Sequence, residues 1–221
     1  MGKSRRISEY VHVGCGSSLV EGWLNIDNSP SIMLARWPFL LRWLKVLRLI
    51  TVQQQAFAQN LNGKAVMWVD CSRALPFSQN SVSAIYSCHV VEHLSRAAAD
   101  SYFKEAYRVL KPGGVIRTIV PDLRCLVESY VDTGDAETFM NAMMVAPKSL
   151  KGLAGAVELM LVGHRNHQWM YDANSLLLAL QNAGFVQVME VPWGETSIEA
   201  PGALDLKERC EGSIVVEAVK T

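Results

Sequence analysis

The sequence predicts an α/β fold built on a mainly parallel sheet. Short apolar runs rich in β-formers alternate along the chain with segments of helical period, which is the pattern of such sheets. The chain has 221 residues, of which 50% are hydrophobic and 19% charged. That length and composition can bury one sizeable core. We therefore expect one domain over residues 1–221, carrying an insertion at about 31–58.

Seven runs are expected to form the strands of this sheet. They lie at residues 10–13, 23–26, 66–69, 83–87, 114–120, 185–191 and 213–219. Two helices are expected between them, at 96–110 and 174–183. The first is stopped by Lys-Pro-Gly-Gly at 111–114, because proline cannot continue a helix and glycine supplies the reversal.

The insertion has the composition of an amphipathic helix. Its aromatic residues Trp37, Phe39 and Trp43 alternate with four cations at near-helical spacing, namely Arg36, Arg42, Lys45 and Arg48. Four charges in about twenty residues disfavour a membrane-spanning helix. We expect a helix over 38–51, starting at a proline, that packs on its own domain or on a second copy in a homodimer. The alternative is a helix lying in a membrane interface.

Charge and cysteine usage narrow the function classes. Lys+Arg and Asp+Glu both number 21, so the chain lacks the basic excess of a protein that binds nucleic acid through its surface. The five cysteines are scattered, without a Cys-x-x-Cys pair, and indicate reduced thiols. No apolar run follows the start of the chain, so no signal peptide is expected. These features favour a cytoplasmic protein, with peripheral contact to the inner face of the membrane through 38–51 as an open alternative.

Three strand ends carry residues suited to binding an adenosine. Gly14 and Gly16 follow the first strand, and Asp27 ends the second, where an acid accepts hydrogen bonds from ribose hydroxyls. Leu19 stands where a dinucleotide loop has its third glycine, which disfavours NAD. Asp70 ends the third strand and is placed to accept from an adenine amino group, with the amide of Cys71 beside it. The alternative is that Asp70 only caps the following turn.

The motifs of the chain, taken in order, resemble those of a known family. They lie at 14–16 (GCG), 22–27 (GWLNID), 75–77 (LPF), 85–94 (IYSCHVVEHL), 108–114 (RVLKPGG), 120–123 (VPDL) and 163–171 (GHRNHQWMY). The family is that of the small S-adenosylmethionine-dependent methyltransferases related to methyltransferase type 11, which are associated with sugar and polysaccharide pathways. The resemblance leaves out the insertion and residues 128–162.

This resemblance implies a Rossmann-like methyltransferase fold: seven strands, mainly parallel, with one antiparallel strand and flanking helices. It implies S-adenosylmethionine as cofactor, lined by Gly14, Cys15, Gly16, Asp27, Asp70, Cys71, Ser87 and His89. The chain departs from the family where His12 replaces an acid before the glycine loop and Ser18 replaces a loop glycine. About ten residues separate Gly16 from Asp27, so the first crossover helix is expected to be short or absent.

Methyl transfer to a hydroxyl also requires a base. The candidates at the carboxyl edge of the sheet are His89, His93, Asp122, His164 and His167. For each there is a structural alternative: His89 and His93 can pack in the core, Asp122 can cap a helix, and His164 and His167 can belong to a lid or structural loop. No metal is expected, because the last two histidines lack visible further ligands.

The sequence thus predicts an enzyme that methylates oxygen of a saccharide or related small acceptor. Histidine and tryptophan at 163–171 suit a sugar, whose CH groups stack on aromatic rings. One alternative is a protein that binds the cofactor without turnover and acts as an interaction or regulatory module. A nucleotide-dependent oxidoreductase is disfavoured by the missing third glycine.

Overall fold

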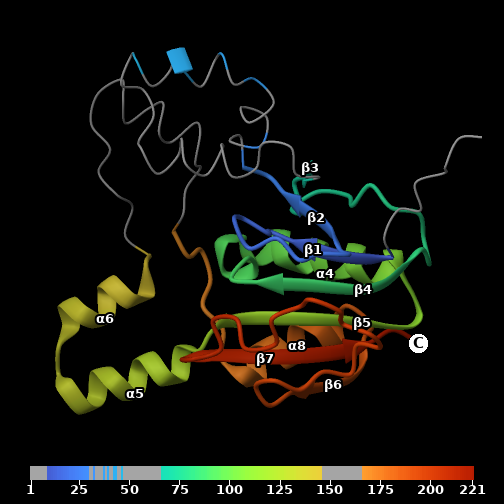
Figure 1. Ribbon diagram of the computed structural model, residues 1–221. Helices are drawn as coiled ribbons and strands as arrows, with labels where there is room; N and C mark the ends of the chain where they lie inside the picture. Colours follow the sequence, from blue (N-terminus) through green and yellow to red (C-terminus); the bar gives the residue numbers. More distant parts are fainter. Residues whose placement is uncertain are drawn as a thin grey trace, which may run out of the picture.

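A seven-stranded sheet forms the centre of the computed structural model, which describes residues 9–29, 66–145 and 166–221 and six single residues between 32 and 46 (Figure 1). The strand order is β3-β2-β1-β4-β5-β7-β6. The first five strands run parallel, and β7 is antiparallel to both its neighbours. The predicted fold class is confirmed. The strands are β1 Tyr10–Val13, β2 Leu24–Asp27, β3 Val66–Trp68, β4 Val82–Cys88, β5 Leu110–Pro121, β6 Val186–Glu190 and β7 Ser213–Val219.

Both predicted helices are present. They are α4 (Arg96–Val109) and α8 (Ala173–Asn182). Ser95 caps α4 by accepting a hydrogen bond from the amide of Ala98, and the apolar stripe of that helix is buried. Strand β5 begins directly after α4, so the Lys-Pro-Gly-Gly stretch lies inside the strand, at an irregularity of its pairing with β4. The other described helices are the 3-10 turn η1 (Val91–His93), α5 (Leu123–Thr133) and α6 (Ala136–Met143).

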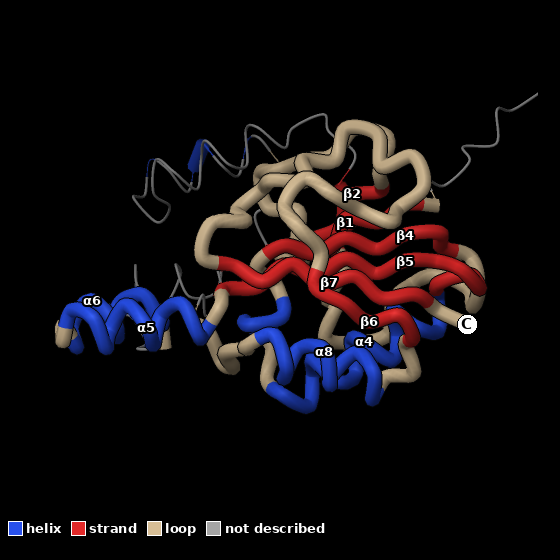
Figure 2. Tube along the Cα trace, turned by 90° about the horizontal axis from the view of Figure 1, so that it is seen from below, coloured by secondary structure: helices blue, strands red, loops and turns tan. Residues whose placement is uncertain are grey.

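The two faces of the sheet are covered differently, as Figure 2 shows. Helices α4 and α8 pack against one face, where Ile116 and Val120 of β5 join the larger apolar cluster. On the other face the described cover consists of the loops 14–23 and 191–212. Val115 and Ile119 face these loops. Alternate residues of a strand point to opposite faces, so β5 is apolar on both sides.

No helix connects β1 to β2, as the short spacing predicted. The side chain of Asn25 holds this connection: its oxygen accepts from the amide of Val20, and its nitrogen donates to the carbonyls of Val20 and Trp23. His12 lies beneath, fully buried, with its Nδ1 3.2 Å from the same Asn25 oxygen. His12 therefore serves the packing of the loop, which accounts for its replacing an acid.

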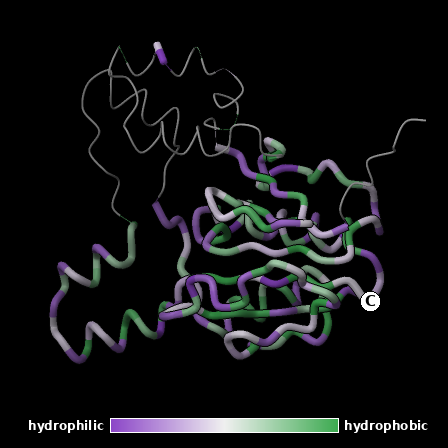
Figure 3. Tube along the Cα trace, in the orientation of Figure 1, coloured by the Kyte–Doolittle hydropathy of each residue, from purple (hydrophilic) through white to green (hydrophobic). Residues whose placement is uncertain are grey.

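Helices α5 and α6 form a hairpin that projects beyond the carboxyl edge of the parallel strands (Figures 1 and 2). Neither helix has a buried residue. Polar and apolar residues alternate along both (Figure 3). The hairpin is held by its own contacts, including the rings of Tyr130 and Phe139 at 5.2 Å and a left-handed Gly134 between the helices.

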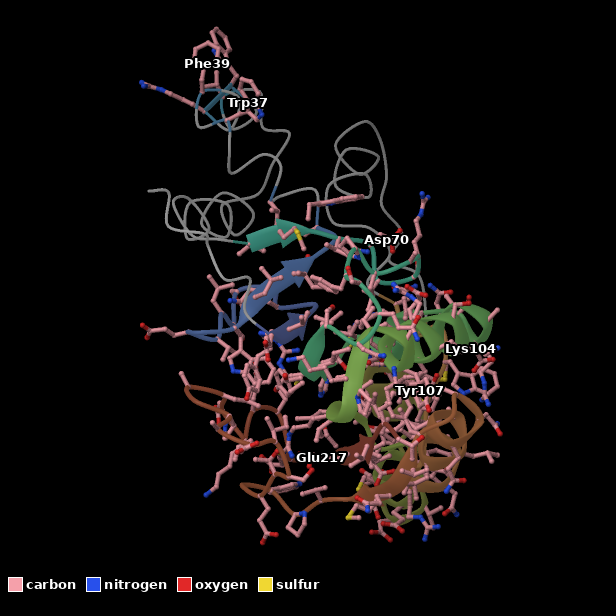
Figure 4. All side chains as sticks on the ribbon, turned by 90° about the vertical axis from the view of Figure 1, so that its right-hand side faces the viewer. Trp37, Phe39, Asp70, Lys104, Tyr107 and Glu217 are labelled. Atoms are coloured by element: carbon pink, nitrogen blue, oxygen red, sulfur yellow. The ribbon has the colours of Figure 1, made fainter. Side chains whose placement is uncertain are left out.

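Most of the predicted insertion lies outside the described residues, so its extent and the helix 38–51 remain predictions. The described positions Phe39, Arg42, Trp43 and Val46 are helical. Trp37 and Phe39 lie far from Glu217 of β7 in Figure 4. Within the described parts of the chain, no helix combines the length and the apolarity needed to span a bilayer.

Candidate active site at the carboxyl edge of the sheet

The loops that follow β1, β2 and β4 meet at one edge of the sheet. Val13 of β1 is paired with Ile26 of β2 and with Ser87 of β4. The amide of Gly14 donates to the carbonyl of Ile26 at 2.8 Å, and that of His89 donates to Ile119 at 2.9 Å. Ligands bind outside this edge in parallel α/β sheets.

The two glycines of the first loop have different roles. Both have left-handed φ, +66° at Gly14 and +48° at Gly16. A Cβ on Gly14 would lie 2.3 Å from Cγ2 of Val90, whereas a Cβ on Gly16 would meet no heavy atom within 4 Å. Gly14 therefore allows a close approach to the β4 loop, and Gly16 leaves open space where a ligand can approach the backbone.

Asp27 is fixed beside this open space. Its Oδ2 accepts from the amide of Gly16 at 2.9 Å and its Oδ1 from the amide of Ser29 at 2.6 Å. Each carboxylate oxygen keeps a further lone pair for a ligand hydroxyl. The arrangement fits an adenosine whose ribose lies against Asp27.

Asp70 also lies at this edge, on the loop after β3 (Figure 4). Its Oδ1 accepts from the amide and hydroxyl of Ser72, and its Oδ2 is 3.3 Å from Nε of Arg73. These contacts are the turn cap that the sequence left as the alternative. Cys71 and Cys15 are buried, and burial raises the pKa of each thiol to about 12, so both stay protonated.

The structure limits how Ser87 can take part in the predicted cofactor lining. The side chain of Ser87 is fully buried, and its hydroxyl donates to Thr118 at 3.4 Å on the helix-covered side of β5. Residues one apart on a strand face opposite ways, so Ser87 points away from the neighbouring Cys88. Ser87 can line the edge only through its backbone.

Three of the five candidate bases come together after β4. His89 has a left-handed φ of +53°, rare for a residue with a side chain. Its Nε2 lies 3.1 Å from the hydroxyl of Ser213, and its Nδ1 lies 3.5 Å from Oε1 of Glu92. The imidazole is 21% exposed. Burial, followed by the charge of Arg209, lowers the pKa of His89 to about 4, so the ring is neutral near pH 7.

Glu92 was not among the predicted site residues. Its side chain is fully buried, and no described residue hydrogen-bonds to its carboxylate. Burial raises the pKa of Glu92 to about 8. The sequence around Glu92, two valines before it and a histidine after it, does not indicate that the side chain is buried. A glutamate after a strand is ordinarily solvent-exposed.

His93 and His167 complete this group. Their rings are 5.0 Å apart, edge to face. Nδ1 of His93 lies 3.2 Å from the carbonyl oxygen of Asn166. His167 is 7% exposed, and its Nδ1 has no hydrogen-bond partner among the described residues. His164, the remaining histidine candidate, lies outside the described residues.

Asp122 behaves as a helix cap. Its Oδ1 accepts from the amide of Arg124 at 2.8 Å, and the thiol of Cys125 donates to its Oδ2. Its backbone bridges to Tyr171, which brings 166–171 beside the end of β5. A catalytic role for Asp122 remains a prediction.

Comparison with known proteins was made for sequence and for structure. Residues 43–118 match the family model described as a methyltransferase domain, Methyltransf_11. The matched span includes Asp70 and residues 89–93. It begins at residue 43, so the glycine loop at 14–16 lies outside it. No curated protein matches the sequence.

Several solved structures resemble the chain at low identity. A chain from the complex of the Haloferax volcanii Trm112 methyltransferase activator is 14% identical, with a TM-score of 0.49, covering 95% of this chain and 81% of that one. An S-adenosylmethionine-dependent methyltransferase of Thermotoga maritima is 15% identical, with a TM-score of 0.48, and the match covers 96% of this chain and 81% of that one. Phosphoethanolamine N-methyltransferase 2 of Haemonchus contortus is 11% identical, with a TM-score of 0.48, and the match covers 96% of this chain and 48% of that one.

The family match and the observed sheet indicate the same fold. The match covers the strands from β3 into β5, and the strand order places the glycine loop and the polar group after β4 at one edge. The chain therefore has the Rossmann-like methyltransferase fold, and S-adenosylmethionine is the cofactor of that family.

Proposed function

We propose that the chain transfers a methyl group from S-adenosylmethionine to a hydroxyl oxygen of a saccharide or related small acceptor. The observation that carries this proposal is the placement of His89. It is a neutral, partly exposed imidazole at the carboxyl end of β4, held between Ser213 and Glu92. Such a group can accept a proton where parallel α/β sheets bind their ligands.

The residues at the edge fit the cofactor. The open space at Gly16 admits a ligand close to the backbone, and Asp27 lies next to it with free lone pairs. We assign Asp70 and the amide of Cys71 to the adenine, as the resemblance to the family implies. When bound, the cofactor supplies a methyl group on a sulfonium, whose departure needs no acid.

His89 has the remaining chemical task. Its imidazole takes the proton of the acceptor hydroxyl as the oxygen gains the methyl group, and S-adenosylhomocysteine is left. The Ser213 contact fixes the ring, and the left-handed backbone directs the side chain away from the strand. Holding donor and acceptor in line and excluding water supply the rest of the rate enhancement.

A cleft lined in part by Ser213, the hydroxyl partner of His89, supports the acceptor class. It has a volume of about 370 Å³ and includes Ser213, whose hydroxyl contacts His89. Trp193 in its wall is 53% exposed. An exposed indole offers a face to sugar CH groups, and the carboxylate of Glu190 accepts from hydroxyls. The lining is Glu190, Val191, Pro192, Trp193, Ser213, Ile214 and Val215.

Calorimetry with S-adenosylmethionine and S-adenosylhomocysteine tests the cofactor step. Gly16→Ala is expected to weaken binding at least about tenfold, because its methyl group enters the open space. Gly134→Ala is the matched control, since Gly134 has φ +68° and equally open surroundings but lies between α5 and α6. Folded protein that binds neither compound would refute the proposal.

Transfer of labelled methyl to a saccharide panel tests the reaction. His89→Asn keeps a residue that tolerates left-handed φ. We expect it to lower kcat about 10²–10⁴-fold while cofactor affinity is unchanged. Cofactor binding without transfer to any panel member would instead favour the alternative of an interaction module without turnover.

We also propose that the helix containing Phe39 and Trp43 contacts an anionic membrane surface. Phe39, Trp43 and Val46 follow one helical face and are 73%, 52% and 69% exposed. The rings of Phe39 and Trp43 lie 5.9 Å apart, with Arg42 on the same helix. Aromatic residues beside cations suit a lipid interface.

Co-sedimentation with anionic liposomes tests this contact. The double variant Phe39→Ser, Trp43→Ser is expected to lose binding. Trp193→Ser, which removes a tryptophan of equal exposure, is expected to keep it. If parent and double variant sediment alike, the membrane proposal is wrong, and a concentration-dependent dimer lost in the double variant would point to a second copy.

A further inference from the structure

Glu92, His93 and His167 bring three metal-binding side chains together at the end of β4. One ligand atom from each lies within 4.8 Å of the others. Two of these residues are adjacent in η1, and the third comes from the segment after the undescribed residues 146–165. This third ligand could not be predicted from the sequence, because Glu92 is distant from His167 along the chain.

The carboxylate of Glu92 gives the first indication of a missing partner. It is fully buried, and no described residue hydrogen-bonds to either oxygen. A buried carboxyl group that accepts no hydrogen bond is costly, so native proteins pair such a group or place a metal on it. Nδ1 of His89 lies 3.5 Å from Oε1 of Glu92, too far for a strong hydrogen bond.

The two histidines are prepared to act as ligands. A carbonyl oxygen can only accept, so Nδ1 of His93 donates to Asn166, and the neutral ring then carries its lone pair on Nε2. Metal-binding histidines ordinarily donate their other nitrogen to a carbonyl or carboxylate in this way. His167 is 93% buried, and its Nδ1 has no partner among the described residues.

The backbone around the group is firmly held. The amides of Gln168 and Trp169 both donate to the carbonyl of Glu92, at 2.7 and 3.2 Å. The side chain of Gln168 donates to the carbonyl of His93 at 2.8 Å. These bonds tie 166–169 to η1, so the three ligands are brought together by structure that does not depend on a metal.

We infer that Glu92, His93 and His167 form a binding site for one divalent transition-metal ion, best suited to zinc. Two imidazoles and one carboxylate leave the fourth tetrahedral position open to water or a substrate oxygen. Zinc ligands at about 2.1 Å lie roughly 3.4 Å from each other. The observed 4.8 Å limit requires a closure of up to about 1.4 Å, a distance that side-chain rotation can cover.

The inference of a metal site does not rest on the proposed methyl transfer. It uses side chains that the cofactor cradle does not, and a metal can bind there whether or not the chain has turnover. Glu92 contacts His89, so a metal on the carboxylate would lie next to the proposed base.

The test is metal binding by the full chain, freed of its purification tag and stripped with a chelator. Zinc titration followed by elemental analysis is expected to give one zinc per chain, and cobalt to give the visible spectrum of a tetrahedral site. Glu92→Gln and His167→Asn are each expected to lower zinc affinity at least about 100-fold. Cys125→Ser removes an exposed thiol, the kind of group that could bind zinc adventitiously, and this control is expected to leave the zinc stoichiometry and affinity unchanged.

Thermal unfolding separates loss of metal from loss of fold. Excess zinc is expected to raise the Tm of the parent by about 5–10 °C and that of Glu92→Gln by none. Glu92→Gln nearly preserves shape, so its far-ultraviolet spectrum reports the fold, and His93→Gln replaces His167→Asn if that variant does not fold. A parent that binds neither zinc nor cobalt, or a Glu92→Gln chain that binds them equally well, overturns the inference.

Discussion

Two buried glutamates, Glu217 in β7 and Glu92 after β4, have opposite hydrogen-bonding environments. The Glu217 carboxylate accepts from Nη1 of Arg117 at 2.7 Å, from the hydroxyl of Thr196 at 2.6 Å, and from the amide and hydroxyl of Ser197. The Glu92 carboxylate accepts no hydrogen bond from any described residue. Both side chains are shielded from solvent to the same degree.

Their hydrogen-bond partners distinguish Glu217 as the glutamate that stabilises the fold. Arg117 also donates to the carbonyls of Glu195 and Leu206, so the pair fastens the loop 191–212 to the sheet face that α4 and α8 leave uncovered. Satisfied buried networks of this kind specify and stiffen a fold. A buried carboxyl group that accepts no hydrogen bond is characteristic of a site that binds a ligand or a proton.

Removing the satisfied carboxylate is expected to have the largest effect. Glu217→Ala leaves the Arg117 guanidinium buried and unpaired, and losing one partner of such a pair costs about 3–5 kcal/mol. The free energy of unfolding, measured by urea titration, is the readout. Glu211→Ala, at an exposed position before the same strand, is the control and is expected to change little. A loss below about 1 kcal/mol at Glu217 would show that the network is dispensable.

A single hydroxyl of the network is expected to matter less. Ser197→Ala removes one donor to Glu217 while the Ser197 amide, Thr196 and Arg117 remain. A hydrogen bond to a charged group contributes about 1.5–3 kcal/mol. The same urea titration checks this value. If Ser197→Ala costs as much as Glu217→Ala, the hydroxyl and not the ion pair anchors the loop.

Lowering the pH is expected to weaken the stability that the same network contributes. Burial raises the pKa of Glu217, but hydrogen bonds from Ser197, Thr196 and Arg117 outweigh it, and the net pKa is lowered. A lowered pKa contributes stability that is complete above the unfolded value, about 4.5, and is lost as pH falls through the folded value. Stability measured from about pH 6 to pH 3 should therefore fall more steeply in the parent than in Glu217→Gln. Parallel curves would contradict this assignment.

Strand and helix positions could be predicted because they depend on local patterns. Alternating apolar runs located all seven strands, and the ten-residue spacing between Gly16 and Asp27 excluded a long first helix. The cover of the second sheet face could not be predicted in this way. The loop 191–212 has no periodicity, and the Arg117–Glu217 pair joins residues a hundred positions apart.

Part of the candidate site could also be predicted from local patterns. Gly14, Gly16 and Asp27 follow strands at fixed places, so the edge they share follows from the strand order. Glu92 was missed because its burial depends on 166–169 folding back over η1, a contact that no local pattern encodes. The direction of the Ser87 side chain could not be predicted, because strand parity does not tell which face of the sheet the helices cover.

Glu92→Gln is expected to have the smallest effect on stability, and it tests the comparison directly. In metal-free protein no hydrogen bond to the carboxylate is lost, so the free energy of unfolding should change by less than about 1 kcal/mol, or rise. The same substitution at Glu217 should cost several times more, because a neutral amide cannot pair with Arg117. The two Gln variants differ only in which buried carboxylate is neutralised, so urea titration of both with chelator present is a matched measurement. A loss of about 3 kcal/mol at Glu92 would mean that its carboxylate has a structural partner, and the contrast between the two glutamates would no longer hold.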